Sequence, residues 1–280
     1  MFVLAALSYL ITVVAVGLFI VRLRQLIALY KKQQPDPTRS GDRAARTKNM
    51  LKEVLGHTKM LNFTGTGIAH WFVMVGFGAL FGTLITAYGQ VIQPDFALPI
   101  IGHFVGYELF AEVIAALTGI GIVTLIGIRQ ATRFWHKGRT SRFAGSNQGR
   151  AYYVEATILA VVFCVIALRG LEGALAQEES WNWHYAISWP AVAFFSSWST
   201  ASIENVIVIV ATLKILVSML WFIVIASNLT MGVAWHRFLA FFNIYFKRNI
   251  DQPSLGALPE MLSHGKPVNF EDPADDDVFG

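Results

Sequence analysis

The chain has 280 residues, of which 55% are hydrophobic and 14% are charged, whereas about 25% of the residues of a soluble domain are charged. This apolar excess excludes an ordinary soluble domain and indicates a protein of the lipid bilayer. The net charge of +4 requires no nucleic-acid partner. The single cysteine, Cys164, excludes a disulfide framework, a thiolate zinc site and an iron–sulfur cluster within this chain.

The first apolar run, Phe2–Val21, is long enough to cross the hydrocarbon core. No basic residue precedes it, and Arg22 and Arg24 follow it, which is the opposite charge order to that of a secretory signal. The run therefore predicts an uncleaved helix whose N-terminus lies outside the cell.

A polar, basic segment, residues 33–60, follows. Within it, Arg43–Leu55 carries apolar side chains at helical spacing, including Met50 and Val54. This pattern predicts a short helix that lies at the cytoplasmic interface.

The second membrane helix is expected over Gly67–Gly89. Gly78 and Gly82 are four residues apart, so on one helix they share a face that another helix or a flat cofactor can approach closely. The apolar stretch Val91–Gly106 contains two prolines and is expected to form an outer loop or a partly re-entrant one.

Three more spans are expected, separated by one basic and one aromatic loop. They cover Tyr107–Ile128, Tyr152–Ala174 and Glu204–Trp235, and the last is longer than a bilayer requires. The connection 175–202 contains four tryptophans and Tyr185 but no lysine or arginine, as is typical of an outer membrane interface.

The distribution of basic residues fixes the predicted orientation. Ten lysines and arginines lie between Arg22 and Lys59 and six lie between Arg129 and Arg150. Basic loops face the cytoplasm, so the N-terminus is outside and the C-terminus inside. The expected fold is an all-α integral membrane bundle of about five helices over residues 1–250. Residues 251–280 are expected to form a disordered acidic tail or a linker to another module.

Two histidines could carry a cofactor. His70 lies a few residues into the second predicted helix and His236 lies at the end of the last one, so both should lie near the cytoplasmic end of the bundle. Imidazoles on facing helices can hold a haem iron axially, and Gly67 could leave room for the macrocycle. The alternative is a pair of interfacial histidines that bind backbone groups or lipid headgroups.

The other histidines are expected to have simpler roles. On a helix continuous with His70, His57 would face away from it, so His57 is expected on the interfacial helix instead. The remaining four should be solvated, in outer loops or cytoplasmic segments: His103, His136, His184 and His264.

Charged side chains within membrane helices are costly and often functional. Lys214, Arg169 and Glu112 are candidates for a quinone site and its proton path. Alternatively, Lys214 could pair with Glu112, while Arg169 and the nearby glutamates (Glu108, Glu112 and Glu172) could extend to the outer interface. No phosphate-binding loop, nucleotide fingerprint or hydrolytic triad is present.

Several stretches resemble one family, the membrane domain of actinobacterial iron–sulfur oxidoreductases. They are residues 54–61, 67–72, 141–146, 242–248, 265–273 and 278–280. The chain is similar to the mycobacterial type of electron transfer flavoprotein dehydrogenase, which is related to heterodisulfide reductase. Its membrane part is similar to the gamma subunit of nitrate reductase.

This resemblance implies a cytochrome-b-like membrane anchor. Electrons from electron transfer flavoprotein would pass through a cytoplasmic iron–sulfur module to menaquinone in the bacterial plasma membrane. In that family a cysteine-rich module follows the equivalent of Gly280, so here it would be either a missing part or a separate subunit. His70 and His236 match the family's ligand positions for one haem b. Leu80 and Ser218 stand where ligands for a second haem would be expected.

The leading hypothesis is therefore a membrane anchor and quinone-reducing subunit of an electron-transfer complex, not catalytic alone, whose basic loops dock the iron–sulfur partner. The alternatives are a cofactor-free structural anchor and a small transporter that uses Lys214 and Arg169 for an anionic substrate.

Overall fold

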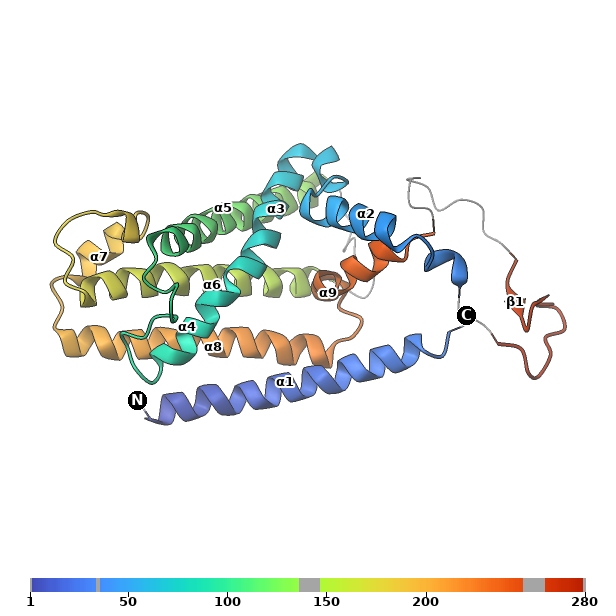
Figure 1. Ribbon diagram of the computed structural model, residues 1–280, viewed down its shortest axis with the longest axis horizontal. Helices are drawn as coiled ribbons and strands as arrows, with labels where there is room; N and C mark the ends of the chain where they lie inside the picture. The colour runs from blue at the N-terminus through green and yellow to red at the C-terminus, as the bar shows by residue number, and fades with distance from the viewer. Residues whose placement is uncertain (1, 34–35, 136–146, 249–259, 279–280) are drawn as a thin grey trace. The chain divides into compact units, whose positions relative to one another are not determined.

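The computed structural model describes residues 2–33, 36–135, 147–248 and 260–278 (Figure 1). His136, the motif at 141–146 and the first part of the predicted tail lie outside these ranges. Contacts divide the chain into two compact units. The first contains residues 1–22 and 59–236, and the second contains residues 23–58 and 237–280.

Within the described residues, four helices are long and apolar enough to cross a membrane, and a bent helix pair provides a fifth candidate span. The four helices are α1 (Phe2–Tyr30), α5 (Val105–Trp135), α6 (Gln148–Leu175) and α8 (Thr200–Ser227). The pair consists of α3 (Thr64–Ala79) and α4 (Phe81–Gln90). The prediction of an all-α, multi-pass membrane protein with about five spans is confirmed.

The second span differs from the single helix predicted, because it breaks at Leu80 and the two halves meet at an angle of 41°. Glycines flank the break and lower helix propensity on both sides. The hydroxyl of Thr83 donates a hydrogen bond to the Leu80 carbonyl, 2.7 Å away. Gly78 and Gly82 therefore lie on different helices and do not form the shared face that the sequence predicted.

The predicted last helix, Glu204–Trp235, is also interrupted. Helix α8 ends at Ser227, and a separate helix, α9 (Gly232–Tyr245), begins after a short turn. The indole N–H of Trp235 donates to the Ile225 carbonyl at 3.2 Å and to the Asn228 carbonyl at 3.1 Å. It thus satisfies carbonyl groups that have no partner within α8, at the end of that helix. His236 is therefore in the first turns of α9 and does not follow a continuous fifth helix.

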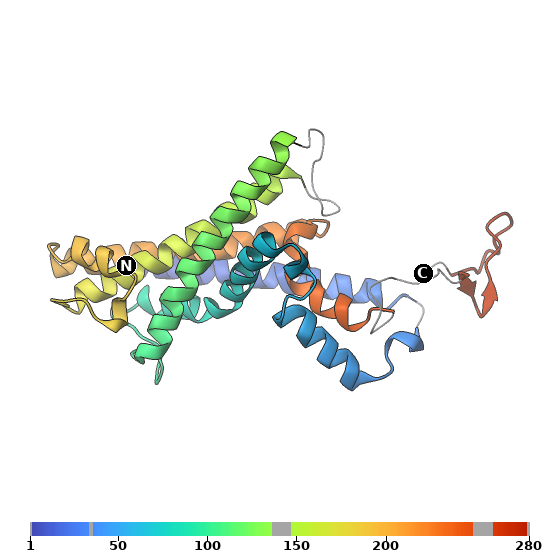
Figure 2. The same ribbon diagram turned by 90° about the horizontal axis from the view of Figure 1, so that it is seen from above.

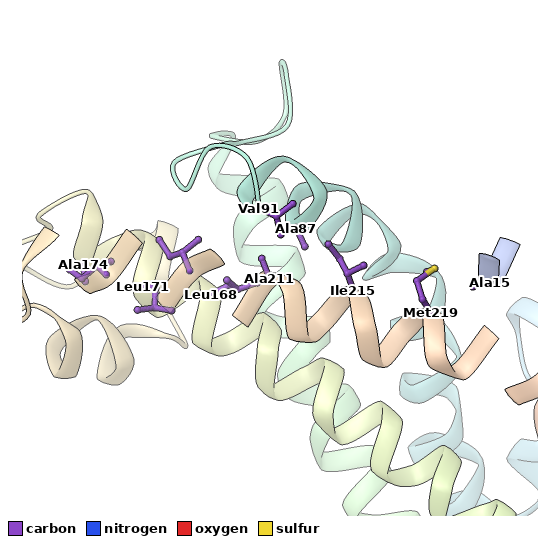
Figure 3. Close-up of a cluster of buried hydrophobic side chains, with 11 residues drawn as sticks. Ala15, Ala87, Val91, Leu168, Leu171, Ala174, Ala211, Ile215 and Met219 are labelled. Atoms are coloured by element: carbon purple, nitrogen blue, oxygen red, sulfur yellow. The ribbon is translucent and has the colours of Figure 1, made fainter. Parts of the chain in front are cut away.

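The core of the first unit consists of small and branched side chains from several helices (Figure 3). Helices α6 and α8 run side by side (Figures 1 and 2), and Leu171 and Ile215 are fully buried between them and α4. Helix α1 adds Ala15 to this cluster, but most of its side chains are exposed. Exposed apolar side chains on a membrane helix face lipid, so this pattern agrees with the predicted span.

Two glycines set the close packing of α3 against α5. A Cβ atom at Gly121 would lie 2.7 Å from the Ala69 carbonyl oxygen, and one at Gly76 would lie 2.0 Å from the Thr118 hydroxyl oxygen. A Cβ at Gly67 would lie 2.4 Å from the carbonyl oxygen of Met60 in the 3-10 helix η2 (Met60–Asn62). Backbone therefore fills the space beside Gly67, which does not provide the room for a macrocycle that we expected there.

The connection between α6 and α8, which the sequence predicts to lie on the outer side and which is called the outer loop below, contains two short helical segments that were not predicted, the 3-10 helix η3 (Trp183–Tyr185) and helix α7 (Trp189–Phe195). Pro190 stands in the first turn of α7, where its missing N–H costs no hydrogen bond.

The second unit contains the predicted interfacial helix, α2 (Arg43–Leu55), after a short 3-10 helix η1 (Pro37–Arg39). Asp42 caps α2 by accepting a hydrogen bond from the Ala45 N–H at 3.2 Å. Arg46 is buried and donates to the carbonyls of Tyr245 and Lys247, at 3.0 and 2.8 Å, at the end of α9.

Two further expectations for the second unit are wrong. His57 does not lie on α2 but follows it, with a positive φ of 52°, and its side chain is buried. Part of the tail expected to be disordered forms an antiparallel hairpin of β1 (Leu262–Ser263) and β2 (Lys266–Pro267).

Candidate functional site

The first candidate site contains the two histidines singled out in the sequence. His70 on α3 and His236 on α9 have ring centres 6.1 Å apart, with 41° between the ring planes. Two imidazoles that share one metal have ring centres roughly 6 Å apart, since each metal–nitrogen bond is about 2 Å and each nitrogen lies about 1 Å from its ring centre. The structure thus brings the two predicted ligands together at a spacing suited to one metal between them.

Hydrogen bonding on His236 also suits a ligand role. Its Nδ1 atom lies 3.3 Å from the Gly232 carbonyl oxygen. With Nδ1–H as the donor to that carbonyl, Nε2 is the nitrogen that carries the lone pair. A ligand histidine typically makes this kind of second hydrogen bond, which fixes the tautomer and orients the ring.

Aromatic packing positions His236. Trp235, the preceding residue, is buried and stacks on Phe19 of α1, with ring centres 5.7 Å apart and 9° between the planes. On the other helix, the residue before His70 is Ala69, whose carbonyl meets Gly121 of α5. Both histidines are therefore adjacent to tightly packed backbone.

The number of protein side chains available limits which kind of metal group could bind between the two histidines. Across the described ranges, no group of three or more His, Cys, Asp or Glu side chains could hold a metal ion. A zinc site requires at least three protein ligands. A haem requires only the two axial ones, because the porphyrin supplies the other four nitrogens, so the two imidazoles fit a haem better than a bare metal ion.

The second candidate site lies at the opposite end of the first unit and is centred on Arg169 of α6. Its guanidinium contacts three carboxylates: Glu108 at 3.1 Å, Glu112 at 3.3 Å and Glu172 at 2.5 Å. It also donates to the His184 carbonyl at 2.5 Å, and its central carbon lies 4.6 Å from the Tyr185 ring centre. Arg169, Glu108 and Glu112 are buried, so the alternative in which they extend to the interface is wrong.

Each carboxylate has further partners. Glu112 accepts hydrogen bonds from the backbone N–H groups of Ile187 and Ser188, at 2.7 and 3.2 Å, and from the Ser188 hydroxyl. Glu172 accepts one from the amide of Gln90, at 2.5 Å. The Arg169 cluster therefore ties α4, α5 and α6 to the outer loop. Burial raises the pKa of Tyr185 in this loop.

The Arg169 cluster borders a cavity of about 390 Å³, within the range of roughly 300–1,000 Å³ that small-molecule sites occupy. Its lining includes Arg169, Glu108 and Glu172 on one side and Thr83, Gln90 and Lys214 on another. Of the three sequence candidates for a quinone site, Lys214 and Arg169 line the cavity. Glu112 does not, because its oxygens face Arg169 and the outer-loop backbone.

Lys214 is 1% exposed, and its ammonium group donates to the carbonyl and the hydroxyl of Thr83, both at 2.8 Å. The alternative that it pairs with Glu112 is wrong. Burial of an ammonium group that binds only neutral partners is costly. Gln90 is also 1% exposed, and its Oε1 atom has no hydrogen-bond partner among the described residues. Lys214 and Gln90 both line the cavity, so an ammonium group and an amide with its oxygen unpartnered among the described residues belong to side chains of its wall.

Sequence reasoning missed Gln90, Thr83 and His184. Gln90 is the last residue of an apolar helix. An amide is unusual at such a position, and this signal could have identified Gln90 as a candidate site residue. The role of Thr83 depends on the break at Leu80, which was not predicted. His184 was expected to be solvated, yet its Nδ1 lies 2.5 Å from a Glu108 oxygen.

The fold and its two sites define a multi-pass helical membrane protein with a histidine pair at one end and a charged cavity at the other. Comparisons with known protein families, curated proteins and solved structures found no match.

Proposed function

We propose that this chain is the membrane subunit of a quinone-linked electron-transfer complex in the bacterial plasma membrane. Electrons would come from a cytoplasmic iron–sulfur protein, fed by electron transfer flavoprotein, and would reduce menaquinone within the bilayer. The observation that carries this proposal is the pairing of His70 and His236 at a ring-centre distance of 6.1 Å.

The histidine pair would hold one haem b. When bound, this group would supply one-electron transfer. The hydrogen bond from His236 Nδ1 to the Gly232 carbonyl would orient the ring and increase the basicity of Nε2. The packing of Trp235 on Phe19 would keep His236 in place.

The cavity would hold the quinone headgroup. A quinone is a flat apolar ring with two carbonyl acceptors, so it suits a pocket that combines apolar walls with a few hydrogen-bond donors. Lys214 would donate to one carbonyl, since its ammonium group has three N–H bonds and Thr83 accepts two. Val165 and Leu168 would contact the ring, because both line the cavity.

The cytoplasmic partner would dock on the basic side of the bundle. Ten lysines and arginines lie between Arg22 and Lys59. Such a surface attracts an acidic protein and increases its association rate at low ionic strength.

The experiment that tests the proposal is a dithionite-reduced minus oxidised absorption spectrum of the purified chain, with a pyridine haemochromogen assay. We expect about one haem b per chain. Folded protein that was produced with haem available and contains none would contradict the proposal, and a cofactor-free anchor would then be the better account.

A further inference from the structure

One contact of the Arg169 cluster has no part in positioning the guanidinium. His184 lies in the loop between α6 and α8, which the sequence predicts to face the outer side, and its side chain is 43% exposed. Its Nδ1 lies 2.5 Å from Oε2 of Glu108. Glu108 is 4% exposed and lines the cavity. An exposed imidazole is therefore joined by one hydrogen bond to a buried carboxyl group at the cavity wall.

These two side chains have the chemistry of a proton relay. Histidine titrates near neutral pH and can accept a proton at one ring nitrogen while it releases another from the second. The groups that face the pair are Arg169, which contacts Glu108 Oε1 and the His184 carbonyl, and the Tyr185 ring, 6.4 Å from the His184 ring centre. The backbone N–H of His184 donates a hydrogen bond to Oδ1 of Asn182, which positions the residue.

We propose that His184 and Glu108 form a proton route from the outer aqueous phase into the cavity. This inference rests on the proposed function, and it adds the side of the membrane from which the protons come. The polar side chains of Gln90 and Lys214, which also line the cavity, independently support it as a candidate site for a polar ligand.

A quinone accepts two electrons from the reductant on the cytoplasmic side and two protons, and each carbonyl oxygen becomes a hydroxyl oxygen. Glu108 gives up one proton at a time to the cavity and regains it from His184, which takes it from outer water. Electrons from one side and protons from the other meet in the cavity, so each turnover moves negative charge across the membrane.

Proteoliposomes that contain the haem-loaded chain, menaquinone and a trapped pH dye test the route. Dithionite added outside reaches the histidine end only in those molecules whose cytoplasmic face points outward. The outer face of these molecules borders the lumen. Valinomycin and K⁺ remove the membrane potential. We expect the lumen to become alkaline by about two protons for each quinone reduced, and protein-free liposomes to show no such change.

The variant His184→Gln keeps a side chain able to form hydrogen bonds but cannot relay a proton. We expect it to slow the lumenal pH change at least ~10-fold while the reduced haem spectrum is unchanged, which also shows that the variant is folded. Glu179→Gln is the matched control, because Glu179 is exposed in the same loop. It should behave like the wild type.

The outcomes separate this inference from the proposed function. Quinone reduction without a lumenal pH change, or a His184→Gln variant as fast as the wild type, would overturn the proton route and leave the proposed function intact. Haem reduction without quinone reduction would overturn the route together with the quinone part of the proposed function.

Discussion

At the predicted cytoplasmic end of the bundle, His70 and His236 are positioned by apolar and aromatic packing. At the other end, Arg169 is positioned by ionic hydrogen bonds to three carboxylates. The first arrangement depends on shape, on Gly121 and on Trp235. The second depends on charge balance. A small change in a side chain held by packing alters its own contacts. Loss of one partner in a buried charge network leaves the other buried charges without a counter-ion.

The largest expected effect is on the histidine pair. Substitution of either His70 or His236 by alanine should remove all haem b, because a single imidazole remains. The measurement is the pyridine haemochromogen assay on purified protein. His103→Ala is the control, since His103 is exposed in an outer loop. Full haem content in both His70→Ala and His236→Ala would contradict the ligand assignment.

The next effect concerns the Arg169 cluster. Arg169→Gln should lower the free energy of unfolding by about 3–5 kcal/mol, because it leaves buried carboxylates without their cation. Thermal unfolding in detergent measures this loss. The exposed Arg43 provides the control, as Arg43→Gln. Equal melting temperatures for both variants would mean that the network does not stabilise the outer end.

Substitution of Lys214 should lower activity without lowering stability. Lys214→Met removes a buried ammonium group that has only neutral partners, so stability should stay the same or rise. Menaquinone reduction in proteoliposomes should fall at least ~10-fold, as one hydrogen-bond donor to the substrate is lost. A variant that is both unstable and fully active would show that Lys214 has a structural role only.

The smallest expected effect concerns the packing of α5 next to His70, which we expect to position this histidine. Gly121→Ala should destabilise the protein by about 1–3 kcal/mol, because its Cβ would lie 2.7 Å from the Ala69 carbonyl oxygen, next to His70. Gly127→Ala on the same helix is the matched control, since nothing lies within 4 Å of its Cβ position. We expect a shifted haem spectrum for Gly121→Ala and an unchanged one for Gly127→Ala.

The sequence was sufficient for the helical class, the number of spans and the approach of His70 to His236. Long apolar runs and basic loops are local features that the bilayer requires, so they can be read from composition. The breaks at Leu80 and after Ser227 were not predicted, because each depends on hydrogen bonds made by Thr83 or Trp235 in the folded chain. The cavity was missed for the same reason. Its wall combines side chains from four helices, and no single stretch of sequence contains that combination.

The ion pairs of Arg169 with Glu108 and Glu112 also bear on how the chain enters the membrane. All three side chains lie at the predicted outer end, so they must cross the bilayer during synthesis. A lone charge in a helix raises the insertion free energy by about 2.5–3.5 kcal/mol. Inserted together as one hairpin, α5 and α6 carry their charges across as a paired set. The contact that stabilises the finished bundle would thus also favour the joint entry of its two central helices.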